Sequence, residues 1–177
     1  LGAKIYYAEN LEKLLSNMAV AQPTIMTAVP RFYQNLYSKI FINFSKQKGF
    51  KRKLIENTIL LGTKNLNKVQ LSFKEKIINF FCENLVRRKI KKQFGGKLKA
   101  FVSGGGALDK KIGEFLNSIG LPTLQGYGLT ETSPVVSCNI PGKIKTHCIC
   151  IVRSGFFRIN SSGKRVTLRK YTGECVA

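Results

Sequence analysis

Residues 98–128, LKAFVSGGGALDKKIGEFLNSIGLPTLQGYG, decide the fold of this chain. An apolar run over 98–102 leads into three consecutive glycines, and Asp109 follows them as a good helix N-cap. Four apolar residues then recur with helical spacing: Ile112, Phe115, Leu116 and Ile119. Gly120 suits the end of this helix, and a second short strand from Pro122 leads into another glycine-containing loop. This order predicts a βαβ unit with parallel strands.

The same alternation precedes this stretch. Residues 3–8 are rich in β-formers and we expect a strand, followed by a helix capped by Asn10. Residues 24–29 form another apolar run, and Pro30 suits the first turn of the next helix. We therefore predict an α/β fold, with a mostly parallel sheet and flanking helices on both of its faces.

Residues 49–96 read as helical. A first helix covers 49–62, and Ser72 with Glu75 forms the capping-box pattern that begins a second, which ends at Gly95 and Gly96. One apolar stripe runs along this second helix and consists of Phe73, Ile77, Phe81 and Leu85. Five cations crowd its last turns: Arg87, Arg88, Lys89, Lys91 and Lys92. Cations there complement the helix dipole, and we favour that interpretation over a nucleic-acid-binding helix.

The chain is strongly basic, with 30 Lys and Arg, 9 Asp and Glu, and a formal charge of +21. The middle of the chain, residues 51–100, carries 14 of the cations and 3 of the carboxylates. Such a surplus favours polyanions, which include nucleic acid, an anionic membrane surface and phosphate-bearing nucleotides. A solvated lysine-rich face is the alternative, and charge alone leaves both open.

Length and composition indicate one domain or a piece of one, because 44% of the 177 residues are apolar. We find no apolar run of the roughly 18 to 20 residues that a membrane-spanning helix needs, and no secretory signal pattern. We therefore expect a cytoplasmic protein, with contact to a membrane periphery as a further possibility. The five cysteines have no repeated spacing, which disfavours a disulfide framework.

Ligands of parallel α/β sheets collect at the carboxyl ends of strands, and two loops follow predicted strands there. In the first, over 103–107, glycines allow a flat ligand to approach the backbone, although a tight turn also needs glycine. The second loop, over 125–134, places Tyr127 between two glycines, followed by Thr130 and Glu131. Such residues can contact a purine, bond a phosphate oxygen and ligate Mg²⁺, or can simply form a surface turn.

Three blocks of sequence resemble one family in the same order. Residues 125–134, QGYGLTETSP, resemble the Y-G-x-T-E core motif of the AMP-forming acyl-adenylate synthetases. Residues 23–31, PTIMTAVPR, and 103–108, SGGGAL, are similar to blocks of its long-chain fatty-acid–CoA ligase branch. The resemblance identifies residues 1–142 as a central segment of the adenylating, AMP-binding domain of such a ligase.

The resemblance implies a two-step ligase that uses ATP, Mg²⁺ and coenzyme A. A fatty acid attacks the α-phosphorus of ATP and releases pyrophosphate, and coenzyme A then displaces AMP. The glycine loop, with Gly105, Gly106 and Ala107, is implied to line the acyl channel and the adenine.

The second loop supplies the other implied contacts. Gly126, Tyr127 and Gly128 are implied to border the adenine. Thr130 is implied to hold the α-phosphate or an acyl oxygen, and Glu131 to ligate Mg²⁺; these two are the candidate catalytic residues. Phe32, Tyr33 and Tyr37 could border a fatty-acid entrance, although core packing is the commoner reason for such an aromatic stripe.

The chain also departs from the family pattern. It lacks the phosphate loop, the ribose-binding aspartate and the lid with its catalytic lysine, so we expect no ligase activity from it alone. A complementary fragment of the same enzyme is therefore a candidate partner, and a split or decayed gene is a candidate origin.

Residues 143–177 form a divergent basic tail, for which poor order is one possibility. A metal site at His147, Cys148 and Cys150 is a weaker alternative there, because the usual ligand spacing is missing. The rival function is a noncatalytic basic module that binds nucleic acid or an anionic membrane surface.

Overall fold

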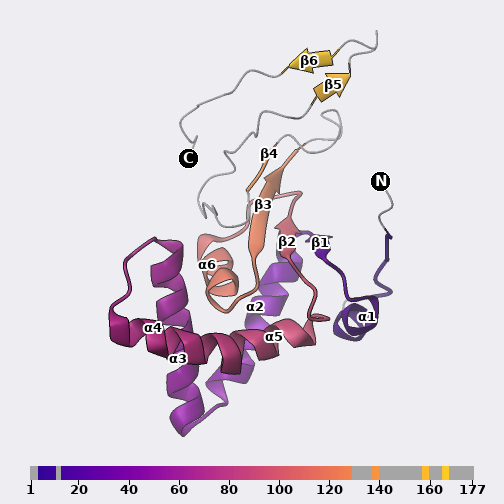
Figure 1. Cartoon of the computed structure of the whole chain (residues 1–177). Helices are drawn as coiled ribbons and strands as arrows, with labels where there is room; N and C mark the ends of the chain where they lie inside the picture. Colours follow the sequence, from indigo (N-terminus) through magenta and orange to yellow (C-terminus); the bar gives the residue numbers. More distant parts are fainter. Residues whose placement is uncertain (1–3, 11–12, 129–136, 140–156, 160–164, 168–177) are drawn as a thin grey trace.

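The computed structural model describes residues 4–10, 13–128, 137–139, 157–159 and 165–167 (Figure 1). In chain order its elements are α1 (Leu14–Ala21), β1 (Ile25–Ala28), α2 (Pro30–Ser45), α3 (Gly49–Leu66), α4 (Phe73–Cys82), the π-helical turn η1 (Glu83–Arg87), α5 (Arg88–Gln93), β2 (Ala100–Ser103), α6 (Lys110–Ser118), β3 (Thr123–Tyr127), β4 (Ser137–Cys138), β5 (Phe157–Ile159) and β6 (Arg165–Thr167).

The main sheet has the order β1-β2-β3-β4. The first three strands are parallel, and β4 pairs antiparallel with β3. The helices α2 to α5 lie between β1 and β2 in the chain, and α6 lies between β2 and β3. The prediction of an α/β fold with a mostly parallel sheet is therefore confirmed. Outside this sheet, β5 and β6 form an antiparallel pair.

Helices α2 and α6 contact each other and share one core with the sheet face that carries Phe101. Both crossovers step in the same direction along the sheet, so right-handed connections place them on one face. The opposite face of β1 is exposed at Ile25 and Thr27. On β2 and β3 the same face is buried, with Ala100 and Leu124 each 4% exposed. The expectation that helices cover both faces therefore stays a prediction.

The core is built around aromatic edges. The ring of Phe101 in β2 meets Tyr33 of α2 edge-on with centroids 5.7 Å apart, and Phe94 at 5.6 Å. The phenol of Tyr33, which is fully buried, donates a 3.0 Å hydrogen bond to the Val102 carbonyl. Phe32 is also buried, and Tyr37 packs edge-on against Phe115 at 4.8 Å. The aromatic stripe of α2 is therefore core packing, the commoner of the two interpretations.

Local signals placed the helix ends well. The Ser72 N–H donates to Glu75 Oε2 at 2.9 Å, and the Asp109 carboxylate accepts from the Lys111 N–H at 2.7 Å. Gly95 and Gly120 both have a positive φ at helix C-termini, as glycine allows.

Two sequence-based expectations failed for tertiary reasons. Residues 4–8 form no strand, because in the described chain nothing pairs with them. Arg87, expected among the exposed cations at the helix end, is 7% exposed and bonds to α3, α4 and the end of α6. It therefore joins helices, whereas Arg88 beside it is exposed.

Candidate functional site

The glycine loop that follows β2 lies beside the ends of β1 and β3 at the carboxyl edge of the sheet, and Gln125 to Tyr127 of the second expected loop belong to β3. Ser103, the last residue of β2, pairs in register with Gln125 of β3 and with Ala28 of β1. The Gly104 N–H donates to the Ala28 carbonyl at 3.2 Å, so the glycine loop leaves the sheet over the end of β1. Parallel pairing thus brings Ser103 beside Ala28, 75 residues earlier, and Gln125, 22 residues later, at the edge where ligands of such sheets bind.

The described residues of all three sequence blocks meet at this edge. A Cβ atom built on Gly105 would lie 3.8 Å from a methyl group of Val29, and one built on Gly106 would lie 3.5 Å from the ring of Pro30. A Cβ on Gly126 would lie 3.4 Å from a methyl group of Val102 and 3.7 Å from the Ser103 carbonyl oxygen. Each block therefore touches the next through its glycines.

The glycines of the first loop differ in whether the local structure requires glycine. Gly105 has a φ of +77°, which is strained for a residue with a side chain, so the turn itself requires glycine there. A Cβ on Gly104 would meet nothing within 4 Å, so sterics within the described chain do not require glycine at that position. Gly105, Gly106 and Ala107 are exposed, and their backbone is accessible to a ligand.

Tyr127 ends β3 with its side chain half exposed, and Gly128 follows it. A half-exposed aromatic ring can contact a flat ligand. Thr130 and Glu131 lie outside the described residues, as do His147, Cys148 and Cys150. A carboxylate such as Glu131 is the hard oxygen donor that Mg²⁺ prefers, so the chemistry of the donor fits.

Ser103 is a feature that the sequence did not single out. Its side chain is fully buried at the end of β2, and its hydroxyl oxygen has no hydrogen-bond partner among the described residues. An unpaired buried polar group of this kind costs about 1–3 kcal/mol. The burial of this hydroxyl depends on packing across three strands, which a local sequence signal does not carry.

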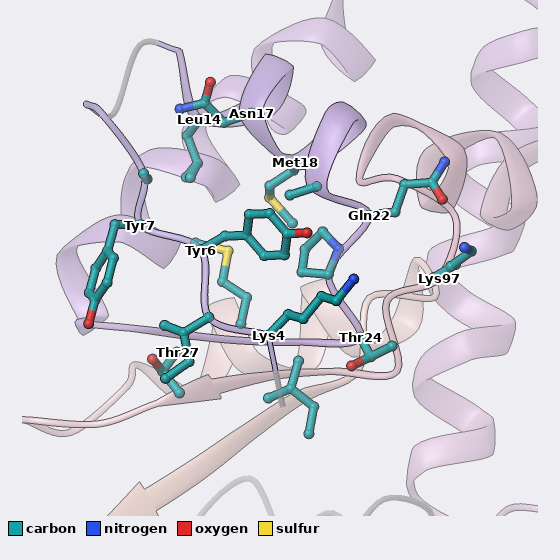
Figure 2. Close-up of a pocket in the computed structure, with 16 residues that line it drawn as sticks. Lys4, Tyr6, Tyr7, Leu14, Asn17, Met18, Gln22, Thr24, Thr27 and Lys97 are labelled. Atoms are coloured by element: carbon teal, nitrogen blue, oxygen red, sulfur yellow. The ribbon is translucent and has the colours of Figure 1, made fainter. Parts of the chain in front are cut away.

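A separate cavity of about 790 Å³ lies between residues 4–8, α1 and β1. Figure 2 shows the ring of Tyr6 beside Met18 in this cavity, with Lys4 and Lys97 among the residues that line it. None of the residues singled out from the sequence as site residues lines it. The cavity is therefore distinct from the edge where the glycine loop leaves β2.

No helix in the described part of the chain is long and apolar enough to span a membrane. Within the same residues, Cys82 and Cys138 are free thiols, and burial raises the pKa of Cys138.

Comparison with known proteins gives the family. The model of the AMP-binding enzyme family matches residues 1–154. The peroxisomal long chain acyl-CoA synthetase 6 of Arabidopsis thaliana is 34% identical over 133 residues, which cover 75% of this chain and 18% of that protein. The long-chain-fatty-acid–CoA ligase FadD15 of Mycobacterium bovis is 29% identical over 128 residues, 72% of this chain and 21% of that protein. A probable chloroplastic acyl-activating enzyme 16 of Arabidopsis thaliana is 46% identical over 72 residues, 38% of this chain and 10% of that protein.

These relatives are much longer proteins than this chain. The chain spans about a fifth of the length of the first two, 18% and 21%. One relative is named as peroxisomal and another as chloroplastic, so the cytoplasmic location expected from the sequence stays a prediction. Since the family model covers most of its length, the chain belongs to the AMP-binding enzyme family.

Proposed function

We propose that this chain is part of the adenylating domain of an ATP-dependent, AMP-forming long-chain fatty-acid–CoA ligase. The proposal is supported most directly by the convergence of the three motif blocks at one sheet edge, through Val29, Gly105 and Gly126. Residues 1–142 supply this segment in the proposal, and residues 143–177 form a divergent tail.

The adenine is proposed to lie between the glycine loop and Tyr127. Gly105, Gly106 and Ala107 offer an exposed backbone on one side, and Tyr127 offers a half-exposed ring flanked by Gly126 and Gly128. A flat purine would gain contact with both surfaces, because the glycines leave the backbone of the first loop open and the Tyr127 ring is half exposed.

Thr130 and Glu131 are proposed to act on the phosphate. The Thr130 hydroxyl donates to an α-phosphate or acyl oxygen, and the Glu131 carboxylate holds Mg²⁺. When bound, the ion neutralises charge on the transferring phosphate oxygens. The fatty-acid carboxylate is itself the nucleophile, so the protein's task is to position groups and stabilise charge.

We propose that the 177 residues by themselves have no ligase activity. The family's phosphate loop, ribose-binding aspartate and lid lysine have no counterpart in this sequence. Without them the site loses most of its positioning and electrostatic stabilisation. A complementary part of the same enzyme is the proposed partner, with fatty acid, ATP and coenzyme A as substrates.

Binding of a non-hydrolysable fatty acyl-adenylate analogue tests the proposal. Titration calorimetry on the full chain should show saturable binding that Tyr127→Ala weakens about tenfold, since a stacked aromatic contributes about 1–3 kcal/mol. Tyr7→Ala is the control, because Tyr7 is 89% exposed and lies outside the glycine loops. Equal affinity in both variants, or no binding to the unmodified chain, would contradict the proposal.

A further inference from the structure

The helix formed by α4 and η1 is apolar on its outer side. Its inner side contacts α3 and includes Cys82 and Val86, both buried. The exposed fractions of five large apolar side chains on this helix are 77% for Phe73, 48% for Ile77, 65% for Phe80, 52% for Phe81 and 44% for Leu85. We call these five residues the α4 apolar face. A cluster of this size, left in water on one helix, is typical of an interaction surface.

Exposed cations accompany this face. Lys74 and Lys76 lie in its first turns, and Arg88, Lys89 and Lys92 follow it on α5. Both of the helix's carboxylates are already engaged: Glu75 pairs with Lys64, and Glu83 pairs with Arg87. Among the described ion pairs none includes the five exposed cations, so they are available to an external anion.

We infer that the α4 apolar face docks on an anionic lipid bilayer. The aromatic and aliphatic side chains enter the boundary between headgroups and acyl chains, and the lysines contact lipid phosphates and carboxylates. In this arrangement the helix lies in the plane of the interface. This inference stands on α4 and its charges and does not depend on the proposed ligase chemistry.

Charge and side-chain type favour this occupant over two others. A second copy of the chain also carries +21, so self-association through this basic surface is opposed by repulsion. Nucleic acid matches the lysines, but it offers no acyl layer for Ile77, Phe81 and Leu85. An anionic bilayer satisfies both the charges and the apolar side chains.

A tryptophan reporter tests the inference, because the chain contains no tryptophan. In Phe80→Trp, vesicles of phosphatidylcholine with about 30% phosphatidylserine should shift the emission to the blue and saturate it, while pure phosphatidylcholine should do so far more weakly. Val20→Trp is the matched control, since Val20 is 87% exposed on α1. Its emission should change little.

Variants in the Phe80→Trp background separate the contribution of the lysine charges from that of the apolar side chains. Lys74→Glu with Lys76→Glu should lower vesicle partitioning about fivefold or more for each lysine, and added salt should reduce the difference. Phe73→Ser with Phe81→Ser should lower partitioning on the same vesicles at least tenfold. All four positions are exposed, so circular dichroism should show an unchanged fold.

Three results would overturn the inference. One is a concentration-dependent blue shift without vesicles, which would mean that a second copy covers the face. Another is an equal shift with a DNA duplex, which would mean a general polyanion site. The third is unchanged partitioning in the serine variants, which would mean that the apolar face stays outside the bilayer.

Discussion

The Nε of Arg87 donates a 3.0 Å hydrogen bond to the backbone carbonyl of Ser118, which joins the π-helical turn to the end of the helix that precedes β3. The same guanidinium donates to the Thr58 carbonyl at 3.2 Å and to Asn79 Oδ1 at 2.8 Å. Arg87 therefore holds α3, α4 and α6 in one arrangement. Because α6 precedes β3 in the chain, this arrangement also helps to set the position of β3, which carries Tyr127.

Replacing Arg87 should destabilise the fold strongly. Arg87→Ala leaves buried carbonyls without a donor, and we expect a loss of about 2–4 kcal/mol in the free energy of unfolding. Arg87→Lys should recover little of it, since an ammonium cannot reproduce the planar fork. Urea unfolding measures both. Arg88→Ala is the control and should change stability by less than about 0.5 kcal/mol. Equal effects at the two positions would contradict this role.

Replacing Gly62 and Gly113 by alanine should change the stability of the fold in opposite directions. A Cβ on Gly62 would lie 2.4 Å from the Ser118 carbonyl oxygen, so Gly62→Ala should cost about 1–3 kcal/mol by forcing α3 from α6. A Cβ on Gly113 would make an ordinary 3.7 Å contact with Leu108, and Gly113→Ala should gain up to about 1 kcal/mol of helix propensity. Thermal unfolding of the pair provides the comparison. A gain for Gly62→Ala would show that the helices separate easily.

The two buried serines also form a matched pair. The Ser118 hydroxyl donates to the Phe115 carbonyl at 2.7 Å, so Ser118→Ala should lose about 1 kcal/mol. The Ser103 hydroxyl has no partner in the described chain, so Ser103→Ala should be neutral or stabilising by up to about 1 kcal/mol. Denaturant unfolding should rank the variants in that order, and a clear loss for Ser103→Ala would indicate a hydrogen bond to this hydroxyl.

Stability should fall in acid partly through Glu75. A hydrogen bond from Lys64, with a smaller contribution from the Ser72 N–H, lowers the pKa of Glu75 below its ordinary 4.5. A lowered folded-state pKa stabilises the fold above the unfolded value, and this contribution disappears as the pH falls through the folded pKa. Melting temperatures from pH 7 down to about 3 should therefore converge for wild type and Glu75→Gln. A constant difference across that range would exclude the linkage.

The features that the sequence predicted are those set by neighbouring residues. Ser72 with Glu75, Asp109 and Gly120 mark helix ends through local backbone groups, and all three were placed correctly. The apolar stripe that begins at Phe73 points to that side of the helix as its buried face. The structure differs, because another side of the helix contacts α3, so Phe73 is exposed and Arg87 is buried. The strand expected over residues 3–8 is absent from the described residues 4–8 for a related reason, since residues with high β-propensity form a strand only where a partner strand lies alongside.

Part of the candidate site could also be predicted from the sequence and part of it stays untested. Parallel strands bring the glycine loop and Tyr127 to one edge, as the order of elements predicted. The roles of Thr130 and Glu131 stay a prediction, because these residues lie outside the described part of the chain.

Photolabelling with 8-azido-AMP tests the central claim most directly, because the reagent marks the residues that border the adenine. Mass spectrometry of the labelled full chain should find adducts in both loops, within residues 103–107 and 125–131, and excess AMP should suppress both. Adducts confined to one loop, or located at the cavity beside Tyr6 and Met18, would contradict the claim that the two loops form one adenylate site.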